Sequence, residues 1–183
     1  MRRVSYLLAA VLLVGAARAD DKPVVVKLNK LSAPAPKEWK SEKPSNRLRT
    51  YQLKLPGAKD HPEAELSVMN ESLPGADKNF PKWKNTFVIP EGKTADDISK
   101  TAKWDVKGAK VDVLDVTGTW KYKAQPIDKK ETLLENWRVI WVIVEERTDK
   151  GEPLETHHLR LSGPAITVAE HAKAFEAWVK SLN

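Results

Sequence analysis

A single apolar run constrains the fold of this chain more than any other stretch. It extends from Trp137 to Val144 and reads WRVIWVIV. Side chains of a strand alternate between its two faces, and in this run both faces are apolar. One face carries Trp137, Val139, Trp141 and Ile143, and the other carries Ile140, Val142 and Val144. A strand that is apolar on both faces is covered on both faces, so we expect a central strand with a packed layer on each side.

Two earlier runs are apolar on one face only. Residues 47–56, RLRTYQLKLP, place Tyr51, Leu53 and Leu55 on one face, and residues 63–70, EAELSVMN, do the same with Ala64, Leu66 and Val68. The turn-forming sequence PGAKDHP separates them, which predicts neighbouring antiparallel strands. A short strand is expected within residues 24–31. The proline-rich segment 32–45 is expected to cross the surface as an extended connection.

The segment from Lys107 to Trp120 also has a strand pattern, but its apolar parity changes along the way. Val111 and Val113 share one face, whereas Leu114, Val116 and Trp120 share the other. Such a change indicates either a β-bulge or a strand that contacts two layers.

Helical periodicity begins after residue 79. Phe80, Trp83 and Phe87 recur at spacings of three and four, which predicts a short helix from about Pro81 to Phe87, with the proline in its first turn. The polar stretch that follows, up to Trp104, predicts a loop with one helical turn.

The C-terminal stretch predicts a strand and then a long helix. Leu159 and Leu161 alternate with polar residues until Gly163-Pro164 ends the strand. Thr167 and Glu170 have the spacing of a capping box. The apolar helical face contains Val168, Ala172, Phe175, Trp178, Val179 and Leu182. All these elements together predict an α+β fold, an antiparallel β-sheet with helices packed on it, arranged as an α/β/α sandwich.

The N-terminal residues have the order of a cleaved signal peptide. Arg2 and Arg3 precede an apolar run, which is followed by the A-x-A site Ala17-Arg18-Ala19. Residues 1–19 are therefore expected to be removed, which leaves one domain from 20 to 183 in the periplasm or outside the cell. No later segment predicts a transmembrane helix. The chain has no cysteine, which excludes disulfides, thiol nucleophiles and Cys-ligated zinc.

Charge argues against a nucleic acid as partner. The formal net charge is +6 and would fall to about +3 with the signal peptide removed. Nucleic-acid binding usually needs a clustered basic face, which a surplus this small does not indicate.

Three blocks carry a resemblance to known proteins. NFPKWKNTF, DVTGTW and LRLSGPAITVAEHAKAFEAWVKSL are similar to blocks of a family of small exported bacterial proteins of planctomycete type, whose function is unknown. More distantly, the arrangement of elements resembles the PsbP-like fold, which occurs in noncatalytic accessory proteins of photosystem II and in a nuclear Ran-binding factor. These resemblances imply a binding or assembly role and supply no active site.

Candidates for chemistry are few. His157 shares a strand face with Glu155, and His61 lies near Glu63 and Glu65, so either set could begin a metal site. The alternative is that His157, on the parity of Leu159 and Leu161, is a half-buried histidine with a satisfied hydrogen bond. Ser162 lacks the G-x-S-x-G elbow of a catalytic serine.

Tryptophans beside lysines are the candidates for ligand binding. Such pairs occur at Trp83 with Lys82 and Lys84, at Trp104 and at Trp120. If exposed together, the indoles would stack on sugar rings or a peptide, and the lysines would attract an anionic polymer. The alternative is that Trp83 and Trp120 belong to the core.

Two hypotheses of function follow. The first is a noncatalytic binding or accessory protein of the cell envelope, whose partner is an envelope protein or a polysaccharide and which needs no cofactor. The second is a metal-dependent or other hydrolase that uses His157 or His61 with nearby carboxylates, which requires those side chains to gather in one pocket.

Overall fold

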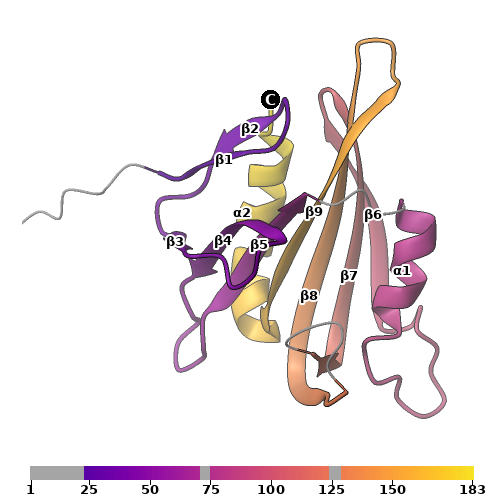
Figure 1. Ribbon diagram of the computed structural model, residues 1–183. Helices are drawn as coiled ribbons and strands as arrows, with labels where there is room; N and C mark the ends of the chain where they lie inside the picture. The colour runs from indigo at the N-terminus through magenta and orange to yellow at the C-terminus, as the bar shows by residue number, and fades with distance from the viewer. Residues whose placement is uncertain (1–22, 71–74, 124–128) are drawn as a thin grey trace, which may run out of the picture.

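A large antiparallel sheet forms the centre of the molecule (Figure 1). The computed structural model describes residues 23–70, 75–123 and 129–183. The sheet contains β3 (Lys40–Glu42), β4 (Arg49–Leu55), β5 (Ala64–Asn70), β6 (Ser99–Val106), β7 (Ala109–Tyr122), β8 (Thr132–Arg147) and β9 (Pro153–Pro164). Their order across the sheet is β3-β4-β5-β9-β8-β7-β6. The remaining elements are a small hairpin of β1 (Val25–Lys27) and β2 (Ser32–Pro34) and the helices α1 (Ala76–Lys84) and α2 (Ala165–Lys180).

The central strand β8 is buried on both faces, as its sequence predicted. Ile140, Val142 and Val144 point into a cluster that α2 completes, and Val139, Trp141 and Ile143 point into a second cluster that α1 completes. We call them the α2-side cluster and the α1-side cluster. The α2-side cluster includes Trp39, Leu53, Leu66, Val68, Leu159, Leu161, Val168, Phe175, Trp178 and Val179. The α1-side cluster contains Phe80, Phe87, Leu114, Val116, Trp120, Val139, Trp141 and Ile143. The result is a mixed α+β fold, in agreement with the predicted class.

The structure explains the change of apolar parity along strand β7. Val111 and Val113 lie in the α2-side cluster, whereas Leu114, Val116 and Trp120 lie in the α1-side cluster. The strand therefore contacts two layers, which is one of the two explanations that the sequence left open. The register shift between Gly118 and Trp120 places the extra residue on β8, because Trp137 and Leu134 are three residues apart.

Residue 183 pairs with the first residue of β2. Ser32 and Asn183 exchange backbone hydrogen bonds, with N···O distances of 2.9 and 3.3 Å. The turn of the β1–β2 hairpin is tied to β8 by a buried carboxylate, since Glu146 accepts hydrogen bonds from the backbone N–H groups of Asn29, Lys30 and Leu31. A carboxylate held by several backbone donors is a strong anchor.

Three predicted elements have different bounds in the structure. The helix expected from Pro81 to Phe87 is α1, Ala76–Lys84, so Pro81 lies inside it and not in its first turn. The loop expected up to Trp104 is wrong beyond residue 98, because β6 begins at Ser99. In β6, which pairs with β7, only the last six residues, TAKWDV, alternate polar with apolar side chains. The extended connection 32–45 includes the short strands β2 and β3.

The capping box expected at Thr167 is also wrong. Helix α2 begins at Ala165 after the N-cap residue Pro164, and no side chain caps it. Thr167 is fully buried, and its hydroxyl accepts a hydrogen bond from Ala58 N and donates one to Pro62 O. This threonine therefore docks the β4–β5 loop on the helix, a long-range role that local spacing could not indicate.

The predicted signal peptide, residues 1–19, lies outside the described residues. Within the part of the chain that the structure describes, neither helix has the length and apolar character needed to cross a membrane.

Candidate functional site

Strand β6 forms one edge of the large sheet, and of the described strands only β7 pairs with it. Thr117 N donates to Ile98 O, which sets the alternation of the antiparallel ladder. Every second residue from Ile98 then faces β7 with its N–H and C=O groups, and the residues between them face outward. The outward residues are Thr101, Lys103 and Asp105. This edge therefore presents a row of backbone donors and acceptors to solvent.

A hollow of about 660 Å³, which we call the Phe80 hollow, lies between this edge and α1. The helix supplies Ala76, Phe80 and Lys84, which recur every four residues and so form one stripe along its surface. The strand supplies Thr101 and Lys103. Figure 1 shows α1 alongside the β6 edge of the sheet. The hollow has an apolar floor with charged groups at its margin.

A second hollow, of about 590 Å³, lies at the other face of the same strand, and we call it the Trp104 hollow. It is lined by Trp104, Val106 and Val111, with Lys103, Lys107 and Arg147 among the charged residues. The Trp104 ring packs edge-to-face on Phe175 of α2, with centroids 6.1 Å apart, so its orientation is fixed by the core. Lys103 lines both hollows, which therefore flank the same stretch of backbone.

Positive charge exceeds negative charge around this edge. Lys84 is paired with Asp96, and Lys110 is paired with Asp112 at 3.0 Å. Among the described residues, Lys103 and Lys107 form no ion pair, whereas Asp105 is the single acidic residue of the Trp104 hollow. The surplus favours a ligand with negative charge.

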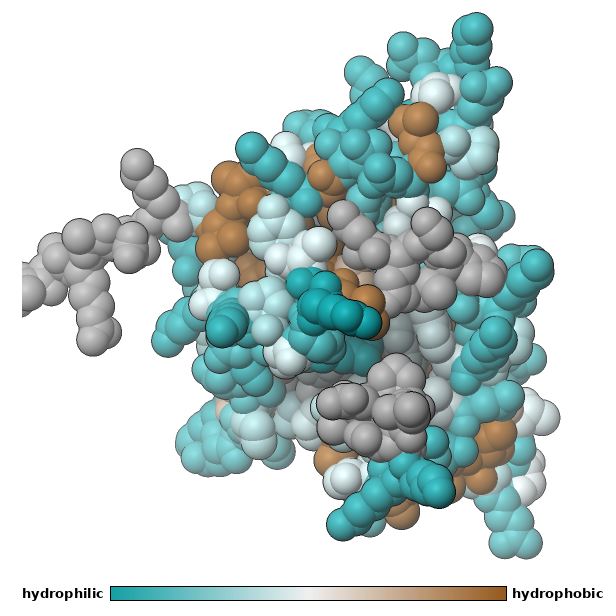
Figure 2. All heavy atoms as spheres, in the orientation of Figure 1, coloured by the Kyte–Doolittle hydropathy of each residue, from teal (hydrophilic) through white to brown (hydrophobic). Residues whose placement is uncertain are grey.

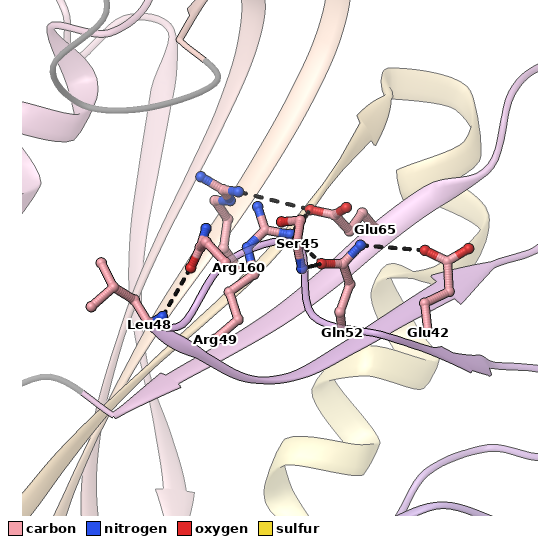
Figure 3. A network of polar contacts seen from close by, with 8 residues as sticks. Glu42, Ser45, Leu48, Arg49, Gln52, Glu65 and Arg160 are labelled. Atoms are coloured by element: carbon pink, nitrogen blue, oxygen red, sulfur yellow. Dashed lines mark hydrogen bonds and ion pairs between the residues drawn. The ribbon is translucent and has the colours of Figure 1, made fainter.

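A second polar group lies at the other end of the sheet, on the face that carries α1 (Figure 3). Arg49 Nη1 donates to Glu65 Oε1 at 2.7 Å and to Gln52 Oε1 at 2.8 Å. Arg160 approaches the same Glu65 oxygen only to 3.9 Å, and its guanidinium carbon lies 5.5 Å from the centre of the Trp120 ring. Two guanidinium groups thus share one carboxylate oxygen.

The candidate residues of the sequence are divided between the two faces. Trp83 is stacked on Trp141 with centroids 5.4 Å apart, and Trp120 is buried against Phe87. Both belong to the α1 side, whereas Trp104 lies on the α2 side. The structure therefore does not bring the three indoles to one surface. Of the predicted lysines, Lys84 lines the hollow beside α1, and Lys82 is exposed on the same helix.

The histidine candidates do not converge. His157 is fully buried, with Nε2 3.3 Å from Glu146 Oε1, while Glu155 and His61 are exposed. Burial lowers the pKa of His157, an effect that the Glu146 charge opposes. His158 points to the opposite face, edge-on to Trp83. Across residues 23–70, 75–123 and 129–183, no three His, Asp or Glu side chains form a group that could hold a metal ion.

Glu146 and the β6 edge were missed by the sequence reasoning. Glu146 continues the parity of Ile140, Val142 and Val144, so an acidic residue on a buried face was the available signal. The β6 edge had no comparable signal, because a strand order cannot be read from local periodicity.

No protein-family model matches the chain, and no curated protein matches it.

Proposed function

We propose that this protein is a noncatalytic binding or accessory protein, exported to the periplasm or the cell exterior, that binds an extended segment of an envelope protein by strand addition at β6. The observation that carries the proposal is the free edge of β6 with a hollow on each face. In strand addition, backbone hydrogen bonds supply affinity and pockets for alternate side chains supply specificity.

The two hollows suit the alternation of an added strand. Side chains of a strand on the β6 edge would point in turn toward the Phe80 hollow and toward the Trp104 hollow. The Phe80 hollow is mainly apolar, whereas the Trp104 hollow combines apolar residues with the unpaired Lys103 and Lys107. The favoured ligand is therefore an extended peptide with alternating apolar residues and nearby acidic residues.

Lysines on an edge strand also have a protective role, because they discourage pairing with other chains. That role does not require a helix stripe or a fixed tryptophan beside the edge. The combination of edge, stripe and indole is what supports a selective site.

The placement of the two helices supports the finer architecture that we propose, an α/β/α sandwich comparable to the PsbP-like fold. Export rests on the signal-peptide pattern of residues 1–19. N-terminal sequencing of the protein isolated from its native envelope tests this part, and a chain that still begins at Met1 would contradict it.

The strand-addition proposal is tested with a proline at the edge. Lys103→Pro removes a backbone N–H that faces solvent, and the preceding Ala102 is already in the extended conformation that proline requires. Lys103→Ala is the matched control, since it removes the charge and keeps the N–H. Peptides are first selected from a phage-displayed dodecapeptide library, and their affinities are then measured by fluorescence anisotropy.

We expect selected peptides with alternating apolar residues and a negative charge. Lys103→Pro should weaken binding at least tenfold more than Lys103→Ala, while urea unfolding shows both variants folded. Failure to select any such peptide, equal effects of the two variants, or binding of envelope polysaccharides in place of peptides would each reject strand addition.

A further inference from the structure

On the face of the sheet that carries α1, two positive charges share one negative charge. Arg49 and Arg160 both approach Glu65 Oε1, but Arg49 donates to it at 2.7 Å whereas Arg160 Nη2 stays 3.9 Å away (Figure 3). The Trp120 ring offers Arg160 a cation–π contact, which is weaker than a charged hydrogen bond. Buried charges in proteins are normally paired. Arg160 therefore has an incomplete set of partners.

Three buried polar atoms on this face of β5 and β9 also have no hydrogen-bond partner among the described residues. They are Arg160 Nε, Ser67 Oγ and His158 Nε2. Ser67 is directly opposite Arg160 in the pairing of β5 with β9, and His158 is two residues from Arg160 on the same face of β9. We call these three residues the polar row. Ser67 and His158 are 0% and 1% exposed, so solvent does not satisfy these atoms.

The chemistry of the polar row favours an anionic acceptor. A guanidinium only donates, a hydroxyl can donate, and an imidazole nitrogen can donate in one of its tautomers. Burial lowers the pKa of Arg160, and the nearby Arg49 lowers it further, whereas the charge of Glu65 opposes this shift. Burial also lowers the pKa of His158 to about 4, so this side chain adds no positive charge at neutral pH. One negative charge would balance the site.

We propose that Arg160, Ser67 and His158 bind a small carboxylate. The Nε and Nη groups along one side of a guanidinium match the two oxygens of a carboxylate. Here Nε has no hydrogen-bond partner among the described residues, and Nη2 makes only a 3.9 Å ion pair with Glu65. Ser67 lies opposite and can donate to either oxygen. The Arg160 side chain is 19% exposed, so solvent reaches part of it, although Nε itself is buried.

The polar row lies on β5 and β9, whereas the strand-addition edge is β6, with β8 and β7 between them. Loss of one site would therefore leave the other intact. A single buried water could satisfy some of the same atoms, but it would supply no negative charge.

The test is thermal unfolding of the purified protein in sodium acetate, sodium chloride and sodium phosphate at matched ionic strength. Arg160→Met keeps an unbranched apolar side chain against Trp120 and removes the donors, and Ser67→Ala is the milder variant. Lys82→Met, which removes an exposed lysine from α1, controls for general salt effects.

We expect acetate to raise the midpoint by several degrees for the unmodified protein and for Lys82→Met. The rise should be smaller for Ser67→Ala and absent for Arg160→Met. If Arg160→Met does not fold, the difference between Ser67→Ala and Lys82→Met decides. An equal rise for these two variants, no rise with acetate, or a larger rise with chloride or phosphate would overturn the carboxylate site.

Discussion

The two faces of the sheet differ in the side chains that they bury and in how the buried polar groups are hydrogen-bonded. The α2-side cluster is mainly aliphatic, and two of its polar side chains are well satisfied: Glu146 accepts hydrogen bonds from three backbone N–H groups, and Thr167 makes two backbone hydrogen bonds. Its unsatisfied buried groups among the described residues are the indole N–H groups of Trp39 and Trp178. The α1-side cluster is smaller and rich in aromatic rings, and the polar row beside it contains buried atoms without partners. Unsatisfied buried groups cost stability and are therefore retained mainly where they have a use.

The helices on the two faces differ in length and in the side chains that they bury. Helix α2 spans 16 residues and buries Phe175, Trp178 and Val179, whereas α1 spans nine residues and contains a proline. The shorter helix leaves a hollow between itself and β6. Figure 2 shows a mainly teal, polar surface on the visible side of the molecule, with a few separate brown, apolar patches. The comparison suggests that the α2 side supplies stability and that the α1 side supplies most of the binding groups.

The largest expected effect is that of Phe175→Ala. This ring is fully buried and contacts Trp39, Trp104 and Trp178. Its removal should lower the free energy of unfolding by about 3–5 kcal/mol, as measured by urea denaturation. Phe80→Ala, at a site 9% exposed on α1, should cost less. An equal or greater loss for Phe80→Ala would contradict the conclusion that the α2 side supplies more of the stability.

Acid should weaken the α1 side through His158. Burial lowers its pKa to about 4 in the folded state, below the value of 6.5 for a free side chain, and the neighbouring His157 lowers it further. The unfolded chain therefore binds more protons between these values. Stability is fully present above about pH 6.5 and falls as the pH drops to about 4, by up to about 3 kcal/mol for this group.

Urea denaturation between pH 7 and pH 4 measures this loss. His158→Gln should reduce the difference in unfolding free energy between the two pH values. Because carboxylates also titrate in this range, the comparison of variant with unmodified protein isolates His158. An unchanged pH dependence in the variant would show that this histidine is not responsible.

Glu146→Gln tests the anchor on the α2 side. The substitution keeps the shape but weakens three charge-assisted hydrogen bonds and the contact with His157. We expect a loss of about 2 kcal/mol and faster hydrogen exchange at the amides of residues 29–31. Glu145→Gln, next to it on the opposite face, removes only a partly exposed pair with Arg147 and should cost about 1 kcal/mol or less. Similar losses for both variants would contradict the anchor.

The smallest expected effects are those of removing the buried hydroxyls of Thr167 and Ser67. Thr167→Val removes two hydrogen bonds on the α2 side and should cost about 1–2 kcal/mol. Ser67→Ala removes a hydroxyl without a partner and, in the absence of carboxylate, should change stability by no more than about 0.5 kcal/mol. Equal losses in urea denaturation would mean that Ser67 is satisfied in solution.

Much of the fold could be predicted because burial leaves a periodic mark on the sequence. The alternation in Trp137–Val144 indicated a strand covered twice, and the helical spacing of Val168, Phe175 and Val179 indicated the buried face of α2. The bounds of α1 were wrong because Phe80, Trp83 and Phe87 fit a helix that starts at Pro81 as well as one that ends at Lys84. Strand β6 was missed because its side chains are mostly exposed.

The candidate sites could be predicted much less well. The tryptophan–lysine pairs pointed to Trp104 and Lys84, which do line the hollows beside β6, but also to Trp120, which is buried. The polar row had no sequence signal, because Ser67, His158 and Arg160 come from strands far apart in the chain.

The sequence by itself determined the α+β class, the two-faced central strand and the amphipathic C-terminal helix, because each depends on a local periodicity of apolar residues. Only the tertiary structure decided which strand lies at the edge, that Thr167 docks a distant loop, and that Glu146 meets the N-terminal hairpin. It also placed Arg160 beside a carboxylate already bound to Arg49. These features depend on pairing between distant segments, where one residue's burial or charge is satisfied by another that no local pattern can identify.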